Sequence, residues 1–183
     1  REGRYASFGA WQGPDSPYRR WYDFSPNYPH GYRCWWGFET LPEVNEEDRS
    51  YREFICGEGG VIDYWLGLGA SGFRLDVADE LPDEVIELMR TATKKAGKDK
   101  VLLGEVWEDA TTKESYGVKR QYALGRGLDS VMNYPFRNAC INFLLGYHTA
   151  YDLKNFFLTQ RLNYPLPMYY SLMNLLSSHD VPR

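Results

Sequence analysis

The chain has 183 residues, 43% of them hydrophobic, and a formal net charge of -4. This length allows one core with a small appendage, and the mild acidity without a Lys/Arg stripe argues against a nucleic-acid partner. No apolar run reaches the roughly 18 residues of a membrane span, and the N-terminal sequence does not resemble a signal peptide. The three cysteines are widely spaced (Cys34, Cys56 and Cys140). We therefore expect free thiols in a reducing, cytoplasmic compartment rather than disulfides or a zinc site.

The first 45 residues are irregular and rich in Trp, Tyr, Pro and Gly. Their aromatic residues are Trp11, Tyr18, Trp21, Tyr22, Phe24, Tyr28, Tyr32, Trp35, Trp36 and Phe38. The simpler interpretation is a loop-rich subdomain that packs through its rings. The alternative is that some rings stack on a flat ligand such as a sugar or a base.

Regular periodicity begins after this segment. A helical pattern covers residues 51–66, is interrupted by glycines, and is expected to end at Gly67 or Gly69. An alternating strand follows over residues 73–77. The clearest helix is 82–97, opened by Pro82 and ended by Gly97. Its expected inner stripe is Val85, Leu88, Met89, Ala92 and Ala96.

The rest of the chain continues to alternate. The pattern predicts, in order, a buried strand, a basic loop, a strand, two helices and a last strand, over residues 101–106, 111–126, 129–133, 136–145, 153–162 and 172–176. Asp152 is the expected N-cap of the second of these helices. Strands that alternate with helices predict a parallel sheet with crossover helices.

Three acids fall at or just past the ends of predicted strands: Asp76, Glu105 and Asp180. The carboxyl ends of parallel strands meet at one edge of a sheet, where chemistry is usually placed. Arg74 and Asp76 lie on the same face of their strand, which by itself is equally consistent with a buried structural ion pair.

Carboxylates gathered at one edge have two main chemical uses. Two of them across a sugar acetal carry out glycoside hydrolysis, one as the ionised group and one as the proton donor. Three can instead hold a divalent metal. Arg74 argues against the metal, because its guanidinium supplies the positive charge beside Asp76.

Three segments resemble signature segments of the α-amylase family of glycoside hydrolases: Gly72-Phe-Arg-Leu-Asp-Val-Ala-Asp-Glu80, Leu103-Gly-Glu-Val-Trp107 and Ser177-Ser-His-Asp180. Leu41-Pro-Glu-Val-Asn45 is similar to a fourth. With Trp35-Trp-Gly-Phe38 and Asp129-Ser-Val-Met-Asn-Tyr-Pro-Phe136, the likeness is closest to the cyclomaltodextrinase, neopullulanase and maltogenic amylase group.

The resemblance implies a role for each matching residue. Asp76 would be the nucleophile, Glu105 the general acid and base, and Asp180 the group that stabilises the transition state. Further residues would bind or orient the substrate: Arg74, His179, Val77, Glu80 and Trp107. Two positions depart from the family pattern, Asp79 where Asn is common and Glu108 where His is common, and both would affect the leaving-group side.

The resemblance also implies a fold of which this chain holds a part. A complete (β/α)8 barrel needs about 250 residues, whereas only four strands are countable here. We expect residues 1–45 to be the C-terminal part of an inserted subdomain. Residues 46–183 would be a partial (β/α)8 TIM barrel, about the fourth to seventh βα units. The chain would thus be an internal fragment of a larger enzyme.

The implied activity is hydrolysis of α-1,4-glucosidic bonds in maltodextrins or cyclodextrins by a retaining mechanism, with α-glucan oligosaccharides as the partners. A transglycosylase, an α-1,6-acting glucosidase and a non-catalytic glycan-binding relative are the alternatives. No cofactor is expected to be required and no metal site is predicted in this chain. Calcium and a homodimer are possible in the full-length enzyme, and the isolated fragment is expected to be inactive.

Overall fold

The computed structural model describes residues 8–182. The chain divides into two compact units, residues 1–61 and 62–183, which are described separately. By packing, the division falls after Val61, so the first helix belongs with the aromatic segment. The assignment of residues 1–45 to an inserted domain stays a prediction.

The first unit is built from short helices and aromatic contacts. Its elements are η1 (Ala10–Gln12), η2 (Arg19–Trp21), η3 (Trp35–Gly37) and α1 (Arg49–Cys56). The side chain of Asp48 caps α1 by accepting hydrogen bonds from the first-turn amides of Ser50 and Tyr51. The Trp21 ring lies 5.5 Å from that of Tyr51 and 5.0 Å from that of Phe54, which packs α1 on the aromatic segment.

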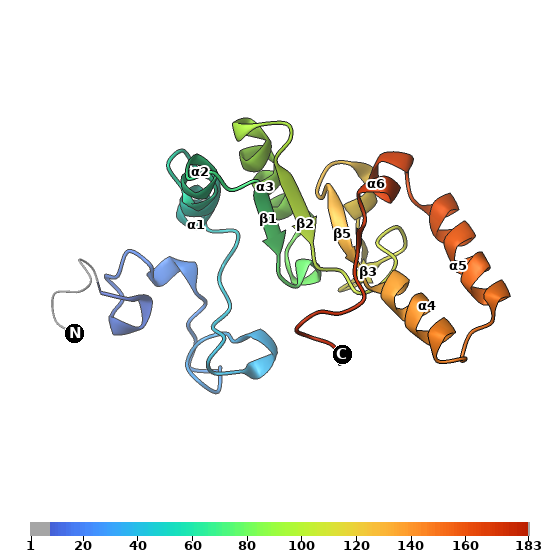
Figure 1. Ribbon diagram of the computed structural model, residues 1–183. Helices are drawn as coiled ribbons and strands as arrows, with labels where there is room; N and C mark the ends of the chain where they lie inside the picture. The colour runs from blue at the N-terminus through green and yellow to red at the C-terminus, as the bar shows by residue number, and fades with distance from the viewer. Residues whose placement is uncertain (1–7, 183) are drawn as a thin grey trace. The chain divides into compact units, whose positions relative to one another are not determined.

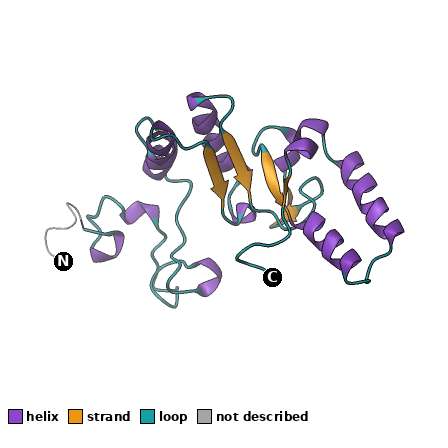
Figure 2. Ribbon diagram, viewed as in Figure 1, coloured by secondary structure: helices purple, strands orange, loops and turns teal. Residues whose placement is uncertain are grey.

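The second unit contains a four-stranded parallel sheet in the order β1-β2-β5-β6. Its strands are β1 (Gly72–Leu75), β2 (Val101–Gly104), β5 (Ser130–Asn133) and β6 (Met173–Asn174). Figure 1 shows β1, β2 and β5 side by side with the same direction, and Figure 2 shows helices between successive strands. The predicted parallel sheet is therefore confirmed.

Gly72 is required at the start of β1. Its φ of 153° is one that L side chains rarely adopt, and an added Cβ would lie 1.9 Å from the carbonyl oxygen of Val101. The absence of a side chain lets β1 approach β2 closely enough to pair with it.

The helices and the smaller elements of this unit are α2 (Val61–Gly67), η4 (Ala78–Glu80), α3 (Asp83–Ala96), η5 (Tyr122–Leu124), α4 (Tyr134–Leu144), α5 (Ala150–Asn163), α6 (Leu166–Ser171) and the antiparallel hairpin of β3 (Glu114–Ser115) with β4 (Val118–Lys119). None of the described helices is long and apolar enough to cross a membrane.

Successive residues of β2 and β5 serve opposite faces of the sheet. Leu102 and Val131 belong to the larger core cluster, which also includes Ile86 of α3 and Met168 of α6. Their neighbours in sequence face a smaller cluster of Met132, Tyr134 and Leu175 with Leu103 packed against it. Helices α3 and α6 thus cover one face of the sheet, and on the other face side chains from the strands and from the residues just after them pack against one another.

Several predicted elements differ from the structure. The pattern over residues 51–66 is two helices, because glycines interrupt it between α1 and α2. In α3 Leu88 is 39% exposed, whereas Ile86 and Thr93 are buried. Thr149, not Asp152, is the N-cap of α5: its hydroxyl accepts from the Asp152 amide while the Asp152 carboxylate accepts from the Thr149 amide.

The other differences concern very short elements. The basic stretch 111–126, expected to be a loop, contains the β3–β4 hairpin and η5. The last strand is only Met173–Asn174, and the unpredicted α6 precedes it. Two-residue strands are too short to show a period.

Candidate active site

The backbone places Asp76 and Glu105 on adjoining strand ends. Leu75 pairs with Gly104 as the last rung of β1 with β2. The Glu105 amide donates to the Leu75 carbonyl at 2.9 Å, and the Glu105 carbonyl accepts from the Ala78 amide at 3.1 Å. Hydrogen bonding therefore continues one step past both strands, and neighbouring strands lie about 4.8 Å apart.

The Glu105 side chain accepts two hydrogen bonds and forms one ion pair, and the residue is only 5% exposed. Its Oε2 accepts from the Val77 amide at 2.7 Å, and its Oε1 accepts from the Trp107 indole at 2.9 Å. Arg74 Nη2 lies 3.2 Å from the same Oε2. Because both oxygens have partners, the plane of the carboxyl group is fixed.

Val77 adopts an unusual conformation that aims its amide at Glu105. Its φ of 40° and ψ of 59° lie in the left-handed region, which costs a β-branched residue about 1–3 kcal/mol. Such strain persists only where the surroundings enforce it.

Arg74 contacts both acids with one guanidinium. Its Nη1 pairs with Asp76 Oδ1, and its Nη2 forms the ion pair with Glu105 without making a hydrogen bond. The Asp76 side chain is 74% exposed, so one carboxylate faces solvent and the other is enclosed. The structure thus brings together Arg74, Asp76, Val77, Glu105 and Trp107.

Asp180 and His179 pair with each other, with 3.3 Å between His179 Nε2 and Asp180 Oδ1. Among the described residues, no hydrogen bond or ion pair joins either of them to Asp76 or Glu105. They are connected indirectly: the Trp107 ring stacks on Tyr134 at 4.2 Å, and the Tyr134 hydroxyl lies 3.0 Å from Ser178 Oγ. That Oγ also accepts from the Asp180 amide at 3.1 Å.

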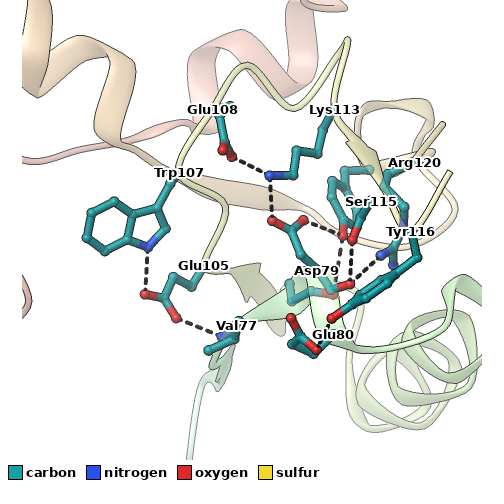
Figure 3. A network of polar contacts seen from close by, with 12 residues as sticks. Val77, Asp79, Glu80, Glu105, Trp107, Glu108, Lys113, Ser115, Tyr116 and Arg120 are labelled. Atoms are coloured by element: carbon teal, nitrogen blue, oxygen red, sulfur yellow. Dashed lines mark hydrogen bonds and ion pairs between the residues drawn. The ribbon is translucent and has the colours of Figure 1, made fainter. Parts of the chain in front are cut away.

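Glu80 is held by the β3–β4 hairpin rather than by the other acids. Its carboxylate accepts from the Tyr116 hydroxyl at 2.6 Å, and Figure 3 shows this contact beside a denser network around Asp79.

Tyr134 and Ser178 lie within two of the family-like segments, but the resemblance gives them no role, and Lys113 lies outside all of these segments. Position gave a signal for Tyr134, which directly follows β5 and so lies at the same sheet edge as Asp76 and Glu105. No pattern marked Lys113, whose contacts depend on how the hairpin folds back. No group of three His, Cys, Asp or Glu side chains among the described residues could hold a metal ion. Calcium therefore stays a prediction for the full-length protein.

Comparison with known proteins shows the family of the chain. A family model described as the catalytic domain of alpha-amylase matches residues 30–183. An amylopullulanase of Thermoanaerobacter thermohydrosulfuricus is 35% identical over 218 residues, covering 100% of this chain and 14% of its own length. A cyclomaltodextrinase of a Bacillus species is 33% identical over 149 residues, covering 80% of this chain and 25% of its own length.

A solved structure agrees. The cyclic alpha-maltosyl-(1→6)-maltose hydrolase of Arthrobacter globiformis in complex with maltose superposes with a TM-score of 0.82 at 25% identity, covering 95% of this chain and 38% of that one. The four-stranded sheet is accordingly part of a (β/α)8 barrel, and the chain spans well under half the length of these relatives. The chain belongs to the α-amylase family of glycoside hydrolases.

Proposed function

We propose that the full-length protein containing this chain hydrolyses α-1,4-glucosidic bonds of maltodextrins or cyclodextrins with retention of configuration. The observation that carries the proposal is the Arg74 guanidinium, which contacts Asp76 and Glu105 at the ends of two paired strands. A retaining enzyme needs its two carboxyl groups about 5 Å apart, and neighbouring parallel strands are spaced by about that distance.

The reaction has two steps. In the first, an Asp76 oxygen attacks the anomeric carbon while Glu105 in its acid form gives its proton to the leaving oxygen, which yields a glycosyl ester and a free sugar hydroxyl. In the second, Glu105 takes a proton from water, the water oxygen attacks the anomeric carbon, and Asp76 leaves as a carboxylate.

The environments of the two acids fit these roles. Arg74 lies beside both acids, but Asp76 is exposed to substrate, whereas Glu105 is enclosed and oriented by Val77 and Trp107. Asp180 and His179 would bind sugar hydroxyls, positioned through Ser178 and Tyr134. The exposed half of the Trp107 ring would face the leaving sugar.

Replacing the two acids in the full-length protein tests the assignment. We expect Asp76→Asn to abolish turnover of maltotriose, and Glu105→Gln to lower kcat by roughly 10²–10⁴-fold, the usual contribution of a general acid. Asp99→Asn, in the loop before β2, and Glu114→Gln, in β3, are matched controls at exposed positions, and neither residue takes part in the hydrogen bonds and ion pairs of Asp76 and Glu105 described above. Wild-type rates for Asp76→Asn would sink the proposal.

The stereochemistry is tested separately. A fluorinated maltosyl fluoride should label Asp76 covalently, and NMR of the first product should show the α-anomer. A first product in the β-configuration would contradict retention.

The bond preference needs its own experiment, because the relatives include enzymes named amylopullulanase as well as cyclomaltodextrinase. Products from maltotriose, pullulan and β-cyclodextrin separate the candidates. Maltose and glucose support α-1,4 hydrolysis, maltotriose from pullulan supports an α-1,6-acting enzyme, and longer oligosaccharides support transglycosylation. Binding without products would indicate a glycan-binding relative.

A further inference from the structure

Both the carboxylate and the backbone carbonyl of Asp79 have polar partners in the segment that follows Glu105. Its carboxylate accepts from the Tyr122 hydroxyl at 2.9 Å and lies 2.9 Å from Lys113 Nζ. Its backbone carbonyl accepts from Ser115 Oγ at 3.0 Å and from Arg120 Nη1 at 2.8 Å. Asp79, in the short helix η4 after Asp76, is therefore bonded through both its side chain and its backbone to residues 113–122, the segment that contains the β3–β4 hairpin.

Lys113 connects Asp79 to a second acid, Glu108. Its ammonium group lies 2.5 Å from Glu108 Oε2 as well as 2.9 Å from Asp79 Oδ2, as Figure 3 shows. The Lys113 side chain is only 15% exposed, whereas that of Glu108 is 60% exposed. Burial disfavours the charged ammonium, but the contacts with Glu108 and Asp79 outweigh it and raise the pKa of Lys113, so the bridge is charged at neutral pH.

The two ends of the bridge belong to the two loops that hold Glu105. Asp79 is two residues beyond Val77, whose strained amide donates to Glu105 Oε2. Glu108 is three residues beyond Glu105 and directly follows Trp107, which donates to Oε1. A shift of either loop would move one of the two hydrogen bonds that fix the carboxyl group.

We propose that Lys113 is a positioning residue for Glu105: by bridging Asp79 and Glu108 it locks the loop after β1 to the loop after β2, and so holds the proton donor toward the leaving oxygen. This inference rests on the proposed function. It also gives Asp79 and Glu108, the two positions that depart from the family pattern, a shared partner and one reason to be acidic.

A substrate series tests this role in the full-length protein. Cleavage of maltotriose expels a sugar alkoxide and needs the Glu105 proton, whereas α-maltosyl fluoride expels fluoride and needs little proton assistance. We expect Lys113→Met to lower kcat/KM on maltotriose by roughly tenfold or more and to leave kcat/KM on the fluoride within about twofold. The parameter kcat/KM reports the first step alone, so the base role of Glu105 in the second step, which both substrates share, does not enter the comparison. Lys113→Arg, which restores the charge, should recover most of the loss.

Lys119→Met is the matched control, since this lysine is exposed on the same hairpin, and it should behave as wild type. Glu108→Gln removes one end of the bridge at an exposed position and keeps the proposal testable if Lys113→Met does not fold; it should show the same substrate dependence to a smaller degree.

Equal losses on both substrates, or no loss on either, would overturn the positioning role of Lys113. Glu105→Gln separates this from a failure of the proposed function. If Glu105→Gln discriminates between maltotriose and the fluoride but Lys113→Met does not, only the role of Lys113 is wrong. If Glu105→Gln does not discriminate either, Glu105 is not the acid.

Discussion

Asn133, at the end of β5, uses all of its hydrogen-bonding capacity although it is only 1% exposed. Its oxygen caps α4 at the Phe136 amide (3.2 Å) and accepts from Gln160 Nε2 (2.9 Å). Its nitrogen donates to Gln160 Oε1 (3.2 Å) and to Asn174 Oδ1 (2.8 Å). One side chain thus connects β5, α4, α5 and β6.

We expect Asn133→Ala to destabilise the full-length protein by about 2–4 kcal/mol, because it removes a helix cap and leaves a buried amide unpaired. A thermal midpoint measured by calorimetry should fall by about 2–4 °C for each kcal/mol in a domain of 150–250 residues. Asn138→Ala, at an exposed position on α4, should change it little. The double variant Asn133→Leu with Gln160→Leu should recover only the part of the loss that comes from leaving Gln160 unpaired, since the Phe136 amide and Asn174 still lose their partner. An Asn133→Ala variant as mild as Asn138→Ala would refute the role of Asn133.

At the scale of single residues, the sequence predicts where in the fold a residue lies better than it predicts which groups that residue contacts. Asp76 and Glu105 could be placed because an acid directly after a parallel strand has to lie at the carboxyl edge of the sheet. The donors around them could not, because the Val77 amide and the Trp107 indole reach Glu105 only once two loops have folded against each other. Asp152 is not the N-cap of α5 but its N3 residue, because Thr149 and Asp152 form a capping box in which the hydroxyl residue is the N-cap; a prediction from Asp152 alone overlooks that spacing.

At the scale of elements, Asp129 fastens α3 to the sheet. Its carboxylate lies 2.6 Å from Arg90 and 2.8 Å from Lys94, both on α3, and accepts from the Leu102 amide at 2.8 Å. Burial works to raise the pKa of Asp129, but the hydrogen bonds from Lys94, the Leu102 amide and Arg90 outweigh it and hold that pKa below its usual value.

The pH dependence of the stability follows from the lowered pKa of Asp129. A carboxyl group whose pKa is lower in the folded than in the unfolded protein contributes stability above the unfolded pKa, about 3.9 for Asp, and the contribution is lost as the pH falls through the folded value. We expect Asp129→Asn to cost about 1.5–3 kcal/mol at pH 7, the range for hydrogen bonds to charged groups. Thermal midpoints of the full-length protein should then differ most above about pH 5 and converge below about pH 4. A difference that stays constant from pH 7 to pH 3 would contradict this role.

The predictability of the elements follows their length. Helix α3 could be delimited to within one residue because Pro82, its first-turn acids and Gly97 mark both ends. The β3–β4 hairpin has two residues in each strand. It is held in place by contacts with η4, such as those of Ser115 with Asp79 and of Tyr116 with Glu80. The hairpin therefore depends on tertiary contacts, and no local periodicity of the sequence predicts it. Lys113 directly precedes its first strand.

At the scale of the whole molecule, the edges of the sheet determine how the 183-residue chain behaves by itself. In the order β1-β2-β5-β6 the outer sides of β1 and β6 pair with no other strand among the described residues. Large apolar side chains are also exposed on and beside α4 and α5, namely Leu144, Leu145, Tyr147, Tyr151, Leu158 and Leu162. Open strand edges and exposed apolar surface both favour association with other chains.

We therefore expect the purified 183-residue chain to self-associate and to release no more maltose from maltodextrins than an Asp76→Asn variant of the full-length protein. Asp76 and Glu105 are held within one pair of strands, so the loss would come from an incomplete substrate cleft rather than from missing acids. Light scattering with size-exclusion chromatography measures the association, and a reducing-sugar assay measures the activity. The full-length protein, in which additional strands would cover β1 and β6, should be monodisperse and active in the same buffers. A monomeric 183-residue chain that releases maltose at a rate comparable with the full-length protein would show that the β1–β2 edge is sufficient and that the remaining strands serve stability alone.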